Sequence, residues 1–238
     1  MSIAENVARV RERIEAAGRR AGLDSREVSL MAVTKTVFPE RIREAYEAGV
    51  RLFGENRVQE FAGKVAALSG LKAAEWHMIG HLQSNKSRAA AELFRGIDSV
   101  DSLRLLQRLN SAAEELGKKL PVLIEINIGG ESAKSGVAAD STGLEQILTR
   151  APQCEFLEIQ GLMTVPPYSE DPEQSRPLFR RMHGLRDQIA ARKLPAISMQ
   201  TLSMGMSHDF EVAIEEGSTC VRIGTAIFGE RAYPQPTV

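Results

Sequence analysis

The chain of 238 residues has few of the residues on which several protein classes depend. It contains only two cysteines, Cys154 and Cys220, and four histidines. Two cysteines are too few for a disulfide framework, so we expect a reduced, cytoplasmic setting. No group of His, Cys, Asp and Glu has the spacing of metal ligands, and we therefore expect no bound metal.

Net charge and long apolar runs are also missing. The 30 Lys+Arg and 31 Asp+Glu leave a charge of −1, which gives no general attraction for nucleic acid or anionic lipid. The longest segment without charged side chains, residues 194–208, is interrupted by proline, glycine and polar residues, whereas a spanning helix needs about 20 mostly apolar residues. Residues 1–20 carry three glutamates among helically spaced apolar residues and predict a surface helix rather than a secretory signal. We expect neither a nucleic-acid partner nor a membrane.

Eight short apolar runs recur along the chain. Consecutive apolar positions are typical of parallel strands that are covered on both faces. The segments between the runs have helical character: residues 39–49 begin with proline and end with glycine, and residues 102–117 place leucines on one face. The runs cover residues 28–35, 52–56, 75–80, 96–101, 121–128, 157–164, 197–205 and 220–229.

Eight strands that alternate with helices predict an α/β protein with a single (β/α)8 TIM barrel, preceded by an extra N-terminal helix. An open doubly wound sheet is the alternative, but it usually has fewer strands, and no G-x-G-x-x-G follows the first run. The length suits one α/β barrel of about 200–250 residues. We therefore expect one barrel domain over residues 1–238, with its strand-bearing core at about 28–229.

Lys35 ends the first run, at the edge where barrels carry their active sites. Its stem could simply cover apolar surface while the amine reaches water. The alternative is a desolvated amine that forms a Schiff base with a carbonyl compound, because burial lowers the pKa of a lysine and increases its neutral fraction. Both interpretations stay open on this residue alone.

Two segments that follow the seventh and eighth runs are suited to an anion. In LSMGMSHD (202–209) a serine is the expected N-cap of the next helix, and a helix start presents free N–H groups. In VRIGTAIFG (221–229) a glycine allows close backbone approach, and a threonine adds a hydroxyl. Barrels often bind phosphate after these two strands. The candidate phosphate ligands are Ser203, Ser207, Gly224 and Thr225.

Arg222 lies inside the last run, where a lone guanidinium is costly unless it meets an acceptor. A lysine at one strand end and a phosphate cradle at two others suit a phosphorylated aldehyde or ketone. Pyridoxal 5′-phosphate (PLP) and the sugar phosphate of an aldolase both satisfy this description. The buried arginine favours PLP, because the ring nitrogen of PLP would give it an acceptor.

Seven strings of this sequence resemble those of the pyridoxal phosphate homeostasis proteins. The resemblance runs from about residue 28 to residue 230. It implies a barrel similar to the N-terminal domain of alanine racemase, monomeric and carrying PLP. The strings are AVTKT (32–36), FGENRVQE (53–60), WHMIGHLQSNK (76–86), INIGGESAKSG (126–136), GLMTVPP (161–167), LSMGMSHD and VRIGTAIFG.

The resemblance also implies a role for each candidate residue. Lys35 corresponds to the Schiff-base lysine that holds PLP as an aldimine, Arg222 to the residue that faces the pyridine nitrogen, and Asn56 to a residue near the cofactor. The phosphate-binding segments correspond to Ser203, Ser207, Gly224 and Thr225.

Three further residues keep two interpretations. Lys134 matches a second lysine that the family can use in PLP handling, although a solvated loop lysine is the alternative. His77 and His81 flank Gly80 near the end of the third run. Either histidine could line the site or form structural hydrogen bonds.

Three functions are compatible with these residues: a PLP carrier that buffers PLP or delivers it to PLP-dependent apo-enzymes, a racemase-like PLP enzyme, and a Schiff-base aldolase. An arginine at the pyridine nitrogen keeps that nitrogen unprotonated and makes the ring a weaker electron sink. Racemases of the alanine racemase type take a catalytic tyrosine from an added β-domain, but only nine residues follow Gly229 here, and Tyr168 is the one tyrosine on a strand-end loop. We therefore expect a PLP homeostasis protein without catalytic residues.

Overall fold

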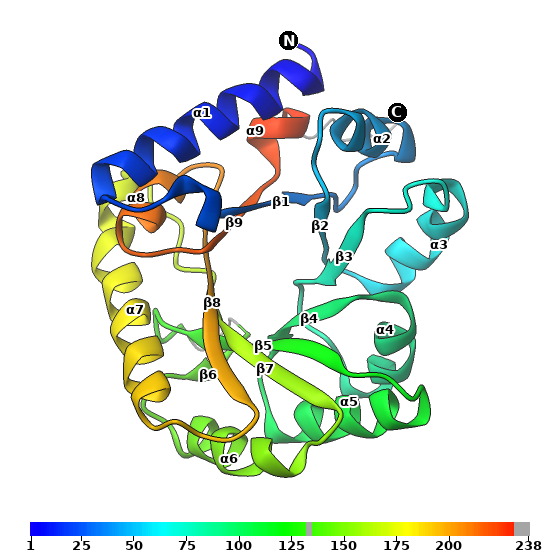
Figure 1. The fold of residues 1–238 in the computed structure, drawn as a ribbon, viewed down its shortest axis with the longest axis vertical. Coiled ribbons are helices and arrows are strands. Elements are labelled where there is room, and N and C mark those ends of the chain that lie inside the picture. Colours follow the sequence, from blue (N-terminus) through cyan, green and yellow to red (C-terminus); the bar gives the residue numbers. More distant parts are fainter. Residues whose placement is uncertain (132–134, 231–238) are drawn as a thin grey trace, which may run out of the picture.

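The chain folds into a ring of parallel strands surrounded by helices (Figure 1). The computed structural model describes residues 1–131 and 135–230. The strands of the ring are β1 (Ser29–Val33), β2 (Leu52–Glu55), β3 (Glu75–Met78), β4 (Gly96–Val100), β5 (Leu120–Asn127), β7 (Leu157–Met163), β8 (Ile197–Met206) and β9 (Cys220–Ile223). Their order is β4-β3-β2-β1-β9-β8-β7-β5, and pairing of β4 with β5 closes the barrel. A two-residue strand, β6 (Val137–Ala138), pairs with the end of β5.

Helices form the outer layer of the ring (Figure 1). No helix in the described part of the chain has both the length and the apolar character needed to cross a bilayer. The α-helices are α1 (Ile3–Ala21), α2 (Pro39–Glu47), α3 (Val58–Leu68), α4 (Ser87–Leu93), α5 (Leu103–Glu115), α6 (Thr142–Arg150), α7 (Arg176–Ala191), α8 (Phe210–Glu215) and α9 (Thr225–Phe228). Short 3₁₀ segments lie at Ser25–Glu27, Ser84–Lys86, Ala151–Gln153 and Pro172–Ser175.

The barrel, the eight strands and the leading helix confirm the fold expected from the sequence. Two local predictions were wrong. The last run does not stay extended to residue 229, because Gly224 turns the chain with a ψ of −80° and α9 begins directly after it. Ser207 is not the N-cap of the next helix either: α8 begins after Asp209, whose Oδ1 accepts a hydrogen bond from the Met206 N–H at 2.7 Å.

Apolar side chains between the strands and the helices form the main core. Phe53 of β2 stacks on Trp76 of β3, with ring centroids 4.8 Å apart, and Phe61 of α3 covers Trp76 at 4.7 Å. Phe94, at the end of α4, continues the cluster at 4.9 Å from Phe61. Aromatic pairs at this separation stabilise a core beyond the area that they bury. Each strand therefore has a buried side that faces the helices in addition to the side that faces the barrel interior. This explains why apolar residues occupy consecutive positions of the strands.

Helix α1 covers the seam between the first and last strands (Figure 1). Ser2 and Glu5 form a capping box at its start, and Gly22 ends it in the left-handed conformation. Asn6 donates a hydrogen bond to the Ile227 carbonyl at 2.9 Å, and Arg13 pairs with Glu211 of α8 at 2.6 Å. Helix α1, which leads into β1, therefore also contacts α8 and α9, the helices that follow the last two strands.

The close approach of β7 and β8 predicts a sharp response to substitution at Gly161. A Cβ there would lie 1.7 Å from the Thr201 carbonyl oxygen, so we expect Gly161→Ala to lower the free energy of unfolding by about 1–3 kcal/mol or more. Gly63→Ala is the matched control, because open space surrounds that position in α3, and it should raise stability by about 0.5–1 kcal/mol. Urea unfolding measures both. Equal stability of the two variants would contradict the packing described here.

Candidate functional site

The carboxyl ends of the strands bring most of the predicted residues to one end of the barrel. Lys35 lies two residues beyond the end of β1 and is half-buried, and Asn56 directly follows β2. Arg222 is the third residue of β9, the strand that pairs with β1. A Cβ at Gly224 would lie 3.7 Å from the Val33 Cβ. The loops that follow β1 and β9 therefore meet at this rim.

A buried ion network holds the backbone on both sides of Lys35. Lys64 Nζ donates to the Thr34 carbonyl at 2.9 Å, to Glu55 at 3.0 Å and to Glu60 at 2.7 Å. Glu60 also accepts the Thr36 N–H at 2.6 Å, and Thr36 has a φ of +62°, which is unfavourable for a β-branched residue. The network thus fixes a strained turn that presents Lys35.

The surroundings of Glu55 and Glu60 shift the pKa values of both carboxyl groups. Burial raises the pKa of Glu55 above its ordinary value, although Lys64 and the Thr34 hydroxyl oppose the shift. Burial also acts to raise the pKa of Glu60, but the hydrogen bonds from Lys64 and the Thr36 N–H lower it overall. Sequence analysis missed this network, even though Glu55 stands beside Asn56 and Glu60 precedes Lys64 by one helical turn.

Arg222 extends into the interior of the barrel and is 3% exposed. Its Nη1 donates to the Ser203 hydroxyl at 2.7 Å, and its Nη2 donates to the Thr164 carbonyl at 2.6 Å. Burial lowers the pKa of the guanidinium, which nevertheless stays charged. Both acceptors are neutral, so in the described residues no direct carboxylate contact cancels this charge. Ser203 contacts Arg222 instead of standing free at the rim.

Ser207 joins the loops that follow β8 and β9. Its hydroxyl accepts the N–H groups of Gly224 at 3.2 Å and Ala226 at 3.3 Å. Thr225, the first residue of α9, is exposed between them. The hydroxyls of Ser207 and Thr225 are thereby gathered beside Gly224, and hydroxyl donors next to a glycine suit a phosphate group.

Four buried side-chain oxygens have no hydrogen-bond partner within residues 1–131 and 135–230. One belongs to Glu55 of the Lys64 network and one to Ser99 of β4, and the other two bear on the candidate site. They are Asn56 Oδ1 and Oε2 of Glu125, a residue of β5 that sequence analysis did not single out. Because buried polar atoms are nearly always paired, these two oxygens indicate a polar ligand. A buried cation, an anion cradle, a lysine and two unpaired oxygens fit the functional groups of PLP.

The two candidate histidines each pair with a carboxylate. His77 pairs with Asp98 at 2.9 Å inside the barrel, and His81, which is exposed, pairs with Asp101 at 3.0 Å. Cys220 is buried, and burial raises the pKa of its thiol to about 12. No metal-binding cluster occurs in the part of the chain that the structure describes. Lys134 lies outside the described residues.

Comparison with known proteins shows what the chain is related to. Residues 3–232 match the family described as alanine racemase, N-terminal domain. A pyridoxal phosphate homeostasis protein of Aquifex aeolicus is 45% identical over 233 residues, which cover 98% of this chain and 100% of that one. The protein of the same name from Pseudomonas aeruginosa is 42% identical, with coverage of 99% and 98%. The chain belongs to the pyridoxal phosphate homeostasis protein family.

Solved structures agree with this family membership. The structure of PipY of Synechococcus elongatus PCC7942 with PLP bound has a TM-score of 0.82 and 36% identity, and the match covers 96% of this chain and all of PipY. An unknown protein from Bifidobacterium adolescentis has a TM-score of 0.84 and 38% identity over 95% of this chain and 94% of its own. Alanine racemase of Clostridium difficile shares the fold, with a TM-score of 0.74 at 16% identity, and this chain covers 58% of it.

The network around Lys35 predicts that the stability of the protein depends strongly on Lys64. Lys64→Met leaves the Glu55 carboxylate buried without its cation, and we expect a loss of about 3–5 kcal/mol in the free energy of unfolding. Arg88→Met removes an exposed cation that pairs with Glu92 and Glu115, and it should cost less than about 1 kcal/mol. Urea unfolding of both variants measures the difference. A similar small loss in both would show that the network does not stabilise the turn.

Glu125 predicts a pH dependence of stability. Burial, followed by the nearby Asp101 carboxylate, raises the pKa of Glu125 from 4.5 to about 7, with Arg222 opposing. Between these values the unfolded chain releases the proton while the folded chain retains it, so the contribution of Glu125 to stability falls as pH rises from 4.5 to 7. The shift corresponds to about 3 kcal/mol.

Glu125→Gln removes that titration. Unfolding free energies of the variant and the parent protein should therefore diverge by about 3 kcal/mol between pH 4.5 and pH 7, in favour of the variant, and stay parallel above that range. Parallel curves across the whole range would contradict the raised pKa.

Proposed function

We propose that this protein binds PLP in the cell and takes part in PLP homeostasis by holding the cofactor and passing it on. The observation that carries the proposal is the PLP-bound structure of PipY, which matches 96% of this chain at 36% identity. The names of the relatives and the polar groups gathered at the carboxyl end of the barrel support it.

Each predicted residue has a part in this proposal. Bound here, PLP supplies an aldehyde that an amine can attack and a conjugated ring that absorbs visible light. Lys35 offers that amine on a fixed turn. Arg222 would face the pyridine nitrogen, and Ser203 orients it through their 2.7 Å hydrogen bond. The remaining site residues are Asn56 near the ring and Ser207, Gly224 and Thr225 around the phosphate.

The position of Tyr168 supports a PLP carrier that does not catalyse a reaction. Racemisation needs a proton-transferring group that is held on the opposite side of the cofactor from the lysine. Tyr168, the strand-end tyrosine considered for that role, is 77% exposed and rests against His208 with ring centroids 5.5 Å apart. An exposed ring on a loop does not provide a fixed base. We further propose a monomeric, cytoplasmic protein whose partners are PLP-dependent apo-enzymes.

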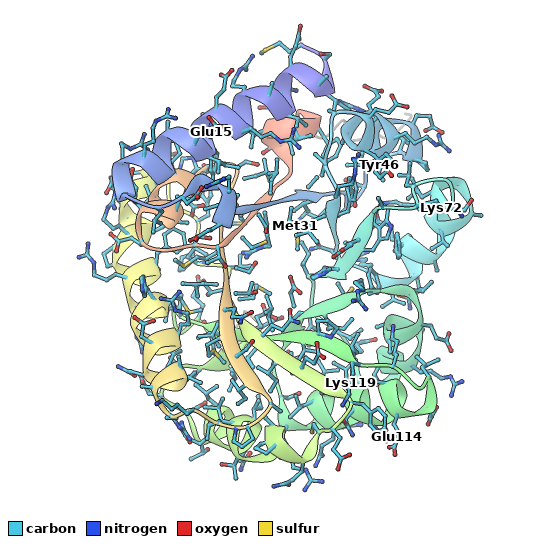
Figure 2. The ribbon with its side chains drawn as sticks, viewed as in Figure 1. Glu15, Met31, Tyr46, Lys72, Glu114 and Lys119 are labelled. Atoms are coloured by element: carbon cyan, nitrogen blue, oxygen red, sulfur yellow. The ribbon has the colours of Figure 1, made fainter. Side chains whose placement is uncertain are left out.

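Absorbance spectroscopy tests the lysine assignment. Purified protein mixed with PLP should show a visible absorbance band that Lys35→Ala lacks, because the variant has no amine at this position. Lys72→Ala is the matched control, since Lys72 is exposed on the loop after α3 (Figure 2) and should leave the spectrum unchanged. Persistence of the band in Lys35→Ala would overturn the assignment.

Activity assays distinguish the carrier from the two enzymes. We expect alanine and serine enantiomers to interconvert no faster than with free PLP, and we expect transfer of PLP to an apo-enzyme to outpace simple dissociation. Racemisation above the free-PLP rate would favour the racemase. Borohydride trapping of a sugar phosphate, with no PLP on the purified protein, would favour the aldolase.

A further inference from the structure

The interior of the barrel contains a cavity at the end opposite to Lys35. Its volume is about 640 Å³, and every strand of the ring contributes to its wall. The wall begins at the amino-terminal residues of the strands: Ser29, Leu52, Glu75 and Cys220 are the first residues of β1, β2, β3 and β9. Met31, labelled in Figure 2, lies inside the ring and forms part of the same wall. We call this space the lower chamber.

The lower chamber exists because small and polar side chains replace the usual filling. The interior of such a barrel is normally packed with layers of bulky branched residues. Here the wall includes Ser29, Gln160, Gln200, Thr201 and Cys220. A volume between about 300 and 1,000 Å³ is typical of small-molecule sites. The lower chamber is therefore large enough for a ligand of several heavy atoms.

The charges of the lower chamber have one predominant sign. Glu27 and Glu75 are exposed at its mouth, and Asp98 lies deeper, with its side chain 3% exposed. No lysine or arginine of the described chain lines it. The one ionisable cation on the wall is His77; burial acts to lower its pKa, but Asp98 and Glu75 raise it overall. Three carboxylates thus face one imidazole.

Asp98 provides the inner contact for a ligand. Its Oδ1 is bonded to His77 Nδ1 at 2.9 Å, whereas its Oδ2 makes no hydrogen bond within the described ranges. Because Asp98 lines the lower chamber, a donor or a cation in that space can reach its carboxylate. Apolar side chains of Met31, Leu52 and Leu123 complete the wall. The combination suits a positive nitrogen on a short hydrocarbon stem.

We propose that the lower chamber is a binding site for small organic cations, with the ammonium group at Asp98 and the stem against the apolar part of the wall. It adjoins the candidate PLP site: Cys220 lines the lower chamber, and Arg222, two residues further along β9, is bonded to Ser203 and Thr164 and interacts electrostatically with Asp98. The proposal does not rest on PLP binding.

Methyl NMR of the whole protein, with ¹³C-labelled methionine, tests the proposal. The probe is N,N-dimethylbutylammonium chloride, a tertiary amine that cannot condense with an aldehyde. N,N-dimethylbutanamide is the neutral probe of similar shape, and sodium chloride matches the ionic strength. We expect the ammonium probe to shift the Met31 methyl resonance saturably and the amide to bind at least about fivefold more weakly. Equal binding of the two probes, or no shift of Met31, would overturn the proposal.

Two variants and one control test which carboxylate binds the ammonium probe. Asp98→Asn should weaken binding of the ammonium probe by about tenfold or more, because it removes the buried carboxylate. Glu75→Gln, an exposed change that preserves folding, should weaken it about two- to fivefold. Glu92→Gln removes an exposed carboxylate of α4, outside the lower chamber, and should leave it unchanged. Unchanged binding in Glu75→Gln and in a folded Asp98→Asn variant would contradict the assignment.

Discussion

Pairing between β1 and β9 joins the first and last strands of the closed barrel, and the position of each functional group depends on that pairing. Ala32 lies opposite Ile223 in the ladder, so the loops that leave the two strands begin side by side. A closed ring has no free strand edge and satisfies its backbone groups internally. Lys35 and Arg222, from the two ends of the sequence, are thereby brought to one rim, where α1 reinforces the seam through Asn6 and Arg13.

Closure also divides the interior into two ends of opposite electrostatic character. At the carboxyl end, Arg222 carries a positive charge that only a hydroxyl and a carbonyl contact directly. At the amino end, Asp98 has one oxygen on His77 and one without a hydrogen bond in the described residues. Electrostatic interactions are stronger inside the barrel than in water because its dielectric constant is lower. The carboxyl end can therefore favour an anionic or hydrogen-bond-accepting group of a ligand, and the amino end a cationic group.

The sequence predicted the fold well because strand and helix patterns are local. Consecutive apolar residues marked all eight strands of the barrel, since each strand is covered on both faces. The errors came from contacts between segments that no local pattern reveals. Ser207 was interpreted as a cap of its own helix, yet its hydroxyl meets N–H groups 17 and 19 residues away. Ser203 stays a predicted phosphate ligand, although it lies opposite Cys220 in the ladder of β8 and β9 and its hydroxyl accepts a hydrogen bond from Arg222.

The parts of the site that sequence analysis missed are also non-local. Lys64 reaches the Thr34 carbonyl across 30 residues, and only the folded ring shows that it holds the turn around Lys35. Glu125 was not singled out in the sequence, and its unpaired oxygen is evident only in the folded barrel. The family strings predicted the cofactor residues, whereas the three-dimensional packing shows which residues hold them in place.

Attachment of PLP at Lys35 is the proposal on which the other site assignments depend. It is tested most directly by incubating the protein with PLP, reducing it with borohydride, digesting it and locating the pyridoxyl phosphate group by peptide mass spectrometry. The chain has eight lysines, so the measurement discriminates among positions. Our account predicts the modification on Lys35. Modification of another lysine in its place, or of none, would contradict the account.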